Sequence, residues 1–283
     1  MKFSYHTHCE FCDGKADASS MAAAAHAAGY SILGFSSHAP LPFTTKWNMP
    51  GTRLEEYART IRALAAAWKP EGLEILLGLE ADWIEDVCAP GDGLFASISP
   101  DFLIGSVHYI KLGGNEIFTV DESESAFDAH LAAASGGDAE PAWREYYHNL
   151  RALIESGGFD ILGHFDLVRK NNRKGRLFDE ESTAYRDEAF ASIELAAKKN
   201  VVVEINTGGV ARRKVDTPYP SLTLLNYMRE SGVRVTLGDD AHAPGHIGAF
   251  NGLAREHAGA AGYRSLWYLD GTHEWKEVGI EDV

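Results

Sequence analysis

The feature that most constrains this chain is a regular alternation of short apolar runs and helical patterns along its 283 residues. Seven runs are apolar, β-branched or aromatic, and each is followed by polar or glycine residues. The predicted strands are residues 3–5, 32–35, 75–79, 102–107, 159–162, 201–205 and 233–237. Such alternation is typical of βα units around a parallel sheet.

Six helical patterns lie between or after these strands, at residues 20–29, 52–72, 141–158, 179–200, 220–232 and 247–262. Asp17 or Ser19 can cap the first helix, and Gly29 can end it. No linker, internal repeat or low-complexity tract divides the chain. No glycine fingerprint follows the first strand, which disfavours an open doubly wound sheet. We therefore predict one closed α/β barrel as a single domain across residues 1–283.

One segment departs from the alternation. Residues 111–141 carry clusters of glycine, acidic residues and alanine between the fourth and fifth predicted strands. We predict a partly helical surface excursion here rather than a separate domain. It is expected to form a lid over the barrel mouth or a subunit contact, and the sequence favours neither. The oligomeric state is likewise not indicated.

The charge balance indicates what kind of partner the protein binds. The chain has 26 Lys and Arg against 41 Asp and Glu, a net charge of −15, which disfavours nucleic acid and anionic membranes. A small substrate is therefore predicted. We expect a cytoplasmic location, because the chain shows no apolar run typical of a signal peptide or a membrane span. Three cysteines are too few for a disulfide framework and are expected to be thiols.

Histidines and acidic residues recur at the carboxyl ends of the predicted strands. The set comprises His6 and His8 after the first strand, His38 after the second, Glu80 after the third, His108 after the fourth, His164 after the fifth, and Asp240 with His242 after the seventh. In a barrel of parallel strands these ends meet at one mouth, where active sites form. Side chains at positions i and i+2 of a strand point the same way, so each close pair can face one centre.

This set exceeds the needs of one metal ion. A tetrahedral zinc site takes four ligands, so we predict two or three ions that share a bridging carboxylate, for which Glu80 is the natural candidate. Asp13 lies in a CDG turn that can bring its carboxylate over the mouth, or it can simply cap that turn. A single buried histidine is more often a satisfied core residue than a ligand, but the shared placement at strand ends favours the metal site.

Other candidate ligands have weaker support. Solvated or capping roles are expected for the histidines in predicted helices or the tail, which are His26, His130, His148, His257 and His273. His246 is left undecided. The Cys9–Cys12 pair lacks the second pair of a structural zinc site, and a redox role is disfavoured because it does not begin a helix.

Arginines near two strand ends predict an anion site. Arg169 follows the fifth strand, and Arg212 and Arg213 follow the sixth in NTGGVARR. A planar guanidinium matches phosphate oxygens bidentately; the alternative for each residue is a solvated surface arginine. Asp166 lies two residues beyond His164, so strand periodicity makes it a candidate general acid, with a water molecule in the metal site as the alternative.

The ordered motifs of the chain resemble those of the PHP (polymerase and histidinol phosphatase) superfamily, and more closely its histidinol-phosphatase branch. They are HTHCEFCDG, GFSSHAPLPF, GLEADW, GSVHYI, GHFDLVRK, NTGGVARR with YPS, and LGDDAH, from Phe3 to about His246. The resemblance implies a distorted (β/α)7 TIM-like barrel, in agreement with the seven predicted strands, and a trinuclear metal site.

The resemblance also implies roles for individual residues. One ion would be held by His6, His8, Glu80 and Asp240, a second by Glu80, His108 and His164, and a third by Asp13, His38 and His242. Many relatives have histidine in place of Asp13, and its oxygen donor would favour manganese, iron or magnesium over zinc at that position. Arg169 and Arg212 would bind the substrate phosphate, with Arg213 as the alternative to Arg212.

The activity implied by the resemblance is hydrolysis of L-histidinol phosphate to L-histidinol and phosphate, a step of histidine biosynthesis, by a metal-activated hydroxide. One alternative is a phosphoesterase of the same superfamily that acts on another small ester, such as a nucleotide. Another is a metal-loaded binding module without turnover, which the complete ligand set disfavours. The residues that would recognise the amine and imidazole of histidinol cannot be identified from the sequence.

Overall fold

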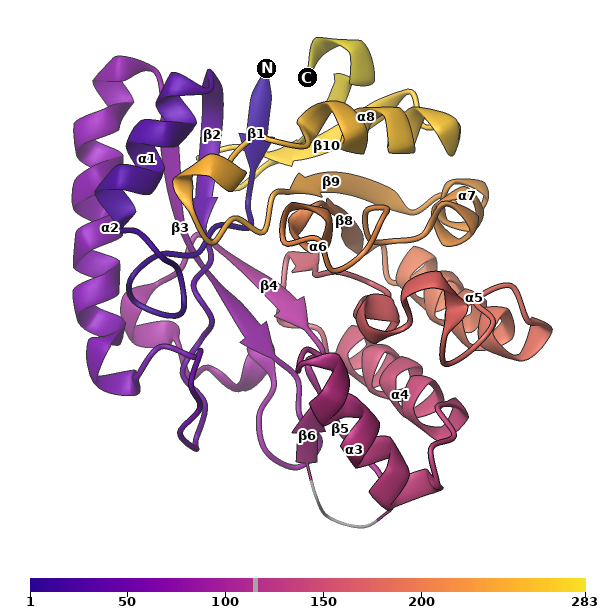
Figure 1. Cartoon of the computed structure of the whole chain (residues 1–283). Helices are drawn as coiled ribbons and strands as arrows, with labels where there is room; N and C mark the ends of the chain where they lie inside the picture. The colour runs from indigo at the N-terminus through magenta and orange to yellow at the C-terminus, as the bar shows by residue number, and fades with distance from the viewer. Residues whose placement is uncertain (114–116) are drawn as a thin grey trace.

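Seven parallel strands form a nearly closed barrel in the computed structural model, which describes residues 1–113 and 117–283 (Figure 1). The strands are β1 (Lys2–Ser4), β2 (Tyr30–Phe35), β3 (Glu74–Asp82), β4 (Phe102–Ser106), β7 (Ile161–Leu162), β8 (Val202–Asn206) and β9 (Arg234–Gly238). Each strand pairs in parallel with the next in this order. The predicted seven-stranded barrel is therefore confirmed.

The barrel closes just beyond the ends of its first and last strands. The His8 amide donates to the Ala241 carbonyl at 2.9 Å, and the Ala241 amide donates to the His6 carbonyl at 3.2 Å. Residues after the first and the last barrel strand therefore share one mouth, and the histidine pair after β1 lies beside the segment that follows β9.

Helices surround the barrel, with α1 and α2 together on one side and α4 and α5 on the other (Figure 1). The helices are α1 (Ala18–Ala27), α2 (Leu54–Trp68), α3 (Glu124–Ser135), α4 (Glu140–Ser156), α5 (Thr183–Lys198), α6 (Gly208–Ala211), α7 (Leu222–Glu230) and α8 (Asn251–Ala260). Asp17 caps α1 by accepting a hydrogen bond from the Ser20 amide at 2.7 Å. All six predicted helices are present. Among the described residues, no helix is both long and apolar enough to cross a membrane.

The predicted surface excursion also contributes to the core. It begins at the end of β5 (Tyr109–Lys111) and contains β6 (Ile117–Thr119), which pairs with β5 in an antiparallel hairpin, and α3. Residues 114–116 of the excursion lie outside the described residues. Phe118, Val120, Phe127 and Leu131 are buried in the main core. The structure thus contains the partly helical segment that was predicted, and it adds that four of its side chains pack into the core. Four apolar side chains scattered among glycine and acidic residues carried too little periodicity to reveal this packing.

A C-terminal hairpin was not predicted from the sequence. It consists of β10 (Ser265–Leu269) and β11 (Trp275–Gly279). The Tyr5 hydroxyl donates to the Leu269 carbonyl at 2.8 Å and accepts from the Leu269 amide at 2.7 Å. Aromatic contacts of Tyr5 with Phe102 and Trp275 join this hairpin to the barrel interior.

Candidate metal centre and active site

Glu80, near the carboxyl end of β3, is the residue on which the predicted ligands converge. Its Oε2 lies 3.1 Å from His6 Nε2 and 2.9 Å from His38 Nδ1. Its Oε1 lies 2.9 Å from His164 Nε2 and 3.5 Å from His108 Nε2. Histidines from four strand ends thus surround one buried carboxylate, as expected for a bridging ligand.

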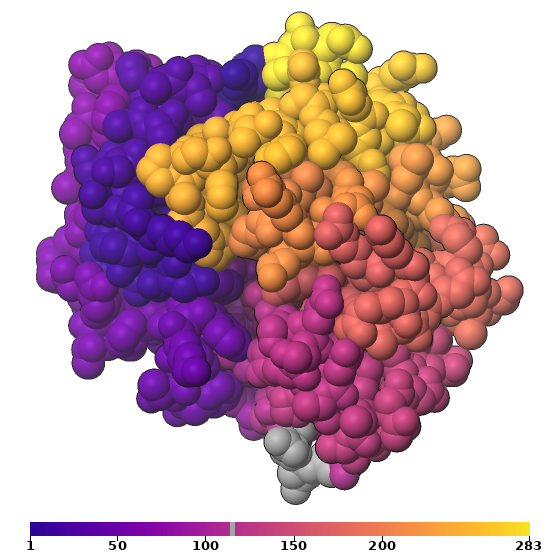
Figure 2. All heavy atoms as spheres, in the orientation of Figure 1, coloured from indigo at the N-terminus to yellow at the C-terminus, as the bar shows by residue number. Residues whose placement is uncertain are grey.

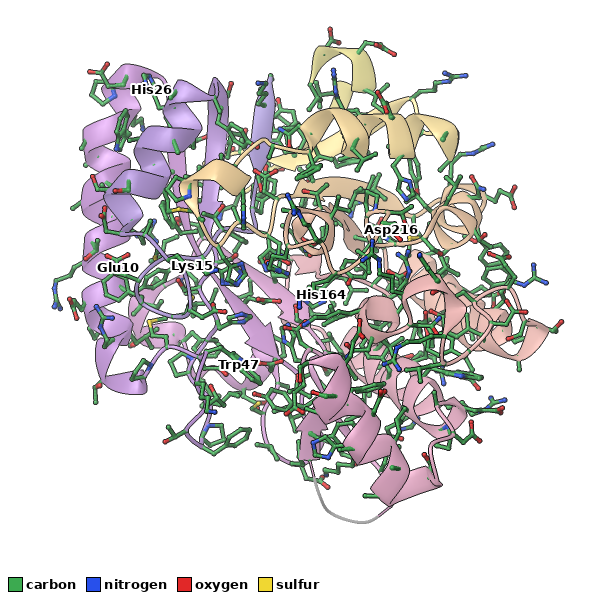
Figure 3. The ribbon with its side chains drawn as sticks, viewed as in Figure 1. Glu10, Lys15, His26, Trp47, His164 and Asp216 are labelled. Atoms are coloured by element: carbon green, nitrogen blue, oxygen red, sulfur yellow. The ribbon has the colours of Figure 1, made fainter. Side chains whose placement is uncertain are left out.

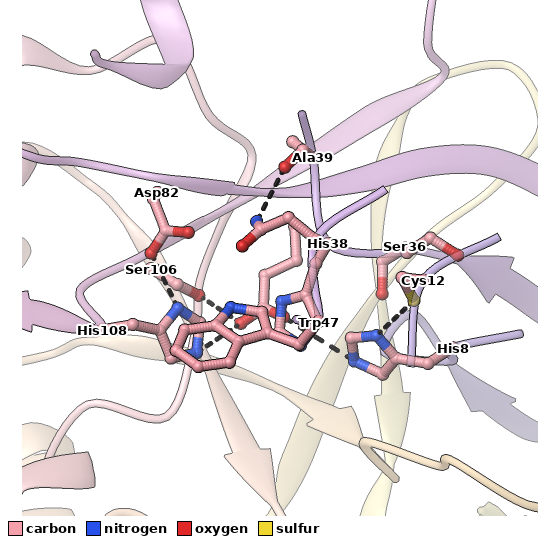
Figure 4. Close-up of polar contacts among 12 residues, drawn as sticks. His8, Cys12, Ser36, His38, Ala39, Trp47, Asp82, Ser106 and His108 are labelled. Carbon is pink, nitrogen blue, oxygen red and sulfur yellow. Dashed lines mark hydrogen bonds and ion pairs between the residues drawn. The ribbon is translucent and has the colours of Figure 1, made fainter. Parts of the chain in front are cut away.

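A second group of donors lies beside Glu80. His8 Nε2 is 3.6 Å from Glu80 Oε2 and 3.5 Å from Asp240 Oδ1. Asp13 Oδ1 lies 3.3 Å from His242 Nε2, and the rings of His8 and His242 stack with centroids 4.0 Å apart. The tertiary structure therefore brings all nine predicted metal ligands together. Figure 4 shows His8, His38 and His108 of this cluster.

The arrangement of donors fits divalent metal ions. Three sets have ligand atoms within 4.8 Å of one another: His6, His8 and Glu80; His38, Glu80 and His108; and His8, Asp13, His38 and His242. His6 Nε2, His8 Nε2 and Glu80 Oε2 are buried without a hydrogen-bond partner, which is costly unless a cation satisfies them. Each pair of sets shares one residue, which is Glu80, His8 or His38, so the implied assignment of ligands to individual ions stays a prediction.

The electrostatics of the cluster favour bound positive charge. Burial would raise the pKa of Glu80, but the charges of His6 and His38 hold that pKa well below its usual range. Burial lowers the pKa of His38, yet Glu80 outweighs it and raises the pKa to about 10. Protons on the imidazoles can therefore balance the buried carboxylate when no cation is bound. Divalent ions can take over this role, since a bound ion is the largest local charge in such a site.

Buried carboxylates behind the histidines fix the orientation of two rings. Both oxygens of Glu204 on β8 lie near His6 Nδ1, at 2.9 and 3.0 Å, and Asp82 Oδ1 lies 2.7 Å from His108 Nδ1. Such pairs are usual around metal-binding histidines. Sequence analysis missed both carboxylates. For Glu204 the available signal was a lone acid inside the apolar run VVVEIN.

The cysteines of the CxxC pair lie close to the centre but outside the three sets of candidate ligands. Cys12 Sγ is 3.5 Å from His8 Nδ1, and Cys9 Sγ is 3.5 Å from Ser37 Oγ. All three cysteines of the chain are free thiols, as expected. Burial raises the pKa of the Cys9 thiol, and a protonated buried thiol is a poor nucleophile. A redox role therefore remains disfavoured.

Arg212 faces the cavity above the ligands, whereas Arg213 does not. The Arg212 guanidinium binds the Asp240 carboxylate with two hydrogen bonds of 2.9 and 2.8 Å. It also reaches within 2.9 Å of His242 Nδ1. Arg213 has a left-handed backbone with φ of 57° and is exposed outside the cavity lining. Of the two predicted alternatives, Arg212 is the residue placed to meet an anion.

The predicted phosphate-binding role of Arg169 and the general-acid role of Asp166 stay predictions, and the structure shows both side chains in buried contacts. Arg169 donates to the Pro218 carbonyl at 3.0 Å and to Thr217 Oγ1 at 2.7 Å. Asp166 is fully buried and accepts from the Ser221 amide at 2.8 Å. Neither residue lines the cavity. Strand periodicity does not apply here, because β7 ends before His164 and a short 3-10 helix begins at Leu167.

The ligands open into a cavity of about 250 Å³, a size suited to a small molecule. Its other lining residues are Lys15, Trp47, Asp121, Leu167, Lys170, Arg212, Lys214 and His246. Lys15, Trp47 and His164 are labelled in Figure 3, where they lie near the centre of the view. In Figure 2, segments coloured indigo, orange and magenta meet at the centre of the same face.

Sequence analysis missed the lysines of this lining because loops, rather than strand ends, carry them. His246, left undecided from the sequence, belongs to the lining. The five histidines expected to be solvated or capping lie outside it: His26, His130, His148, His257 and His273.

The fold and the site together define a barrel protein with a candidate metal centre of imidazole and carboxylate ligands. The family model of the PHP domain matches residues 4–208. The chain therefore belongs to the PHP domain family.

Individual relatives agree with this membership. The chain is 31% identical to the "Probable histidinol-phosphatase" of Deinococcus radiodurans over 231 residues, which cover 80% of each chain. It is 26% identical to the histidinol-phosphatase of Bacillus subtilis over 259 residues, 86% of this chain and 94% of the relative.

Solved structures share the fold. A candidate histidinol phosphatase of Listeria monocytogenes superposes with a TM-score of 0.78 at 21% identity, covering 87% of this chain and 97% of that one. The histidinol phosphate phosphatase of Lactococcus lactis, solved with zinc, L-histidinol and phosphate, gives a TM-score of 0.67 at 23% identity. That match covers 94% of this chain and 95% of the other.

Proposed function

We propose that this protein is a metal-dependent phosphomonoesterase that hydrolyses L-histidinol phosphate to L-histidinol and phosphate, in histidine biosynthesis. The observation that carries the proposal is the convergence of nine candidate histidine and carboxylate ligands, one of which is Glu80, at the floor of a small cavity. The names of the relatives supply the substrate. The proposal includes a cytoplasmic enzyme with a small phosphate ester as its partner, and it requires neither nucleic acid nor a membrane.

The metal ions are part of this proposal. His6, His8, Asp13, His38, Glu80, His108, His164, Asp240 and His242 would hold up to three ions of zinc, manganese, iron or magnesium. When bound, such ions supply a water nucleophile with a lowered pKa and neutralise phosphate oxygens as Lewis acids.

The protein's own residues position and neutralise the substrate. Arg212 is anchored by Asp240 and presents a fixed positive charge to the cavity, which suits a phosphate oxygen. Lys15 and Lys214 add positive charge to the same lining. Behind the ligands, Glu204 and Asp82 hold imidazole rings in place, so the site needs little reorganisation during the reaction.

The test is phosphate release from L-histidinol phosphate by the purified protein with its metal content measured. A panel of nucleotide and sugar phosphates is assayed beside it. We expect a clear preference for L-histidinol phosphate. His8→Ala removes a central donor and should abolish turnover, whereas His148→Ala, at an exposed position of α4, should leave it unchanged.

Other outcomes would separate the alternatives. Metal-dependent turnover of a different ester would keep the mechanism and overturn the substrate. Binding of metal without turnover of any ester would overturn the enzyme assignment and favour a binding module.

A further inference from the structure

The metal centre and Arg212 account for a phosphate group but not for the remainder of the proposed substrate. L-Histidinol phosphate also carries an ammonium group and an imidazole ring, which need an anion and an apolar or aromatic surface. Outside the candidate metal ligands, the described cavity lining offers one carboxylate, Asp121, and one large aromatic ring, Trp47. Both residues lie outside the sequence motifs that identified the site.

The surroundings of Asp121 hold it in one position. Asn171 Nδ2 donates to the carbonyl of Val120 at 3.1 Å and to that of Glu122 at 3.4 Å, which fixes the backbone on both sides. Lys170 donates to the backbone carbonyl of Asp121 and to its Oδ1, the latter at 2.5 Å. A side chain that recognises a substrate group must be held in a fixed position of this kind.

The ion pair with Lys170 leaves part of the Asp121 carboxylate accessible. The Lys170 side chain is only 10% exposed, whereas the Asp121 side chain remains 39% exposed. Lys170 therefore serves mainly to hold Asp121, while the accessible part of the carboxylate can meet a second cation. Phosphate is disfavoured at this position, because it would lie against a negative charge.

Trp47 forms an aromatic wall backed by the hairpin that leads to Asp121. Its ring stacks on Tyr109 with centroids 5.9 Å apart and an interplanar angle of 28°. Tyr109 on β5 pairs with Thr119 on β6, two residues before Asp121. Trp47 shares the cavity with His38 and His108, the residues drawn with it in Figure 4. The described part of the excursion thus supplies Asp121, and Tyr109, just before it in the sequence, supports Trp47.

We propose that Asp121 binds the ammonium group of the substrate and that Trp47 stacks on its imidazole, so that these two residues determine specificity. This inference rests on the proposed function and extends it. Asp121, from the described part of the excursion, and Trp47 then form the wall of the cavity that determines specificity.

The test compares L-histidinol phosphate with the analogue that lacks only the amine. Asp121→Asn should lower kcat/KM for the parent ester by roughly 10- to 100-fold, the range expected for loss of a charge-assisted hydrogen bond. The kcat/KM for the analogue should change by less than about twofold. Asp121→Glu should restore part of the preference. Asp128→Asn, which alters an exposed acid on α3 that pairs with Arg176, should change neither ester.

The role of Trp47 in binding the imidazole is tested by a separate measurement. Trp47→Leu should raise KM for both imidazole esters, while turnover of a small phosphate ester without a ring stays the same. L-Histidinol binding to the metal-loaded protein, measured by calorimetry, should weaken in Asp121→Asn and in Trp47→Leu. Thermal unfolding of each variant confirms that the fold is kept.

The outcomes distinguish this inference from the proposed function. If the wild type prefers the parent ester and Asp121→Asn keeps that preference, the Asp121 assignment is overturned and the proposed function stands. An equal loss for both esters would also overturn it, because it would indicate general damage to the site. If the wild type hydrolyses the two esters equally well, the Asp121 assignment fails and the proposed function stands. If it hydrolyses neither ester, the proposed function fails, and the inference that rests on it fails too.

Discussion

At the scale of single residues, the proposed metal chemistry depends on side chains that contact the candidate ligands from the side away from the cavity. His6 can present Nε2 to an ion because Glu204 engages Nδ1. The same carboxylate accepts from the His164 amide and from Asn206 Nδ2, each at 2.8 Å. Glu204 therefore connects two histidine-bearing strand ends, and its effect should reach beyond a single ring.

Replacing Glu204 with glutamine should weaken metal binding without unfolding the protein. Loss of the charge that holds His6 is expected to lower metal affinity by roughly 10- to 100-fold, as for other outer-shell carboxylates. Metal titration against a competing chelator measures this change. Glu194→Gln, an exposed change on α5 that keeps the same chemistry, is the matched control. Equal affinities in the two variants would contradict the orienting role of Glu204.

At the scale of the elements, β3 carries Glu80 because its neighbours allow close packing inside the barrel. The ring of Phe102, at the start of β4, lies over Gly78 of the adjacent strand β3 and over Gly34 of β2, one strand further. A Cβ added to Gly78 would lie 2.3 Å from the ring, and one added to Gly34 would lie 2.6 Å from it. The small residues in GFSS and LLGLE therefore leave room for an aromatic side chain from the next strand.

Gly78→Ala should destabilise the barrel by overpacking. The added methyl must displace a buried ring, which typically costs about 1–3 kcal/mol in the free energy of unfolding. Urea denaturation monitored by circular dichroism measures the difference. Gly252→Ala in α8, where nothing lies within 4 Å of the added atom, should leave stability unchanged or slightly higher. A Gly78→Ala protein as stable as the wild type would show that Phe102 can move aside.

At the scale of the whole molecule, the candidate metal centre joins the segments that follow the first and the last strand of the barrel. Ligands before residue 14 meet ligands after residue 239, at the position where hydrogen bonds between His6, His8 and Ala241 close the barrel. Ions bound there would tie the first strand to the last. Metal binding should therefore contribute to the stability of the entire fold.

Removal of metal with a chelator should lower the melting temperature by about 5–10 °C. A ligand at 100 times its Kd adds about 2.7 kcal/mol, and each kcal/mol shifts the midpoint by about 2–4 °C for a protein of roughly this size. Differential scanning fluorimetry checks the loss and its recovery with zinc or manganese. His8→Ala should respond far less to metal. A melting temperature that does not depend on metal in the wild type would count against a metal centre.

The sequence by itself determined the parallel barrel and the position of its site. Strand and helix periods are local properties of the sequence, and the carboxyl ends of parallel strands must meet once the barrel closes. His6, Glu80 and His242 were therefore recognisable as candidate ligands before any contact was known. Strand periodicity does not extend to Asp166 in the same way, because β7 ends at Leu162, so the role of Asp166 stays a prediction.

Only the tertiary structure decided which cations face the cavity and which residues form its wall. Arg169 turns into buried contacts with Thr217 and Pro218, whereas Lys170, the next residue, reaches the lining. Asp121 and Trp47 come from loops whose conformation depends on contacts distant in the sequence. The physical reason is that periodicity orients side chains within strands and helices, but a loop takes its shape from what it packs against.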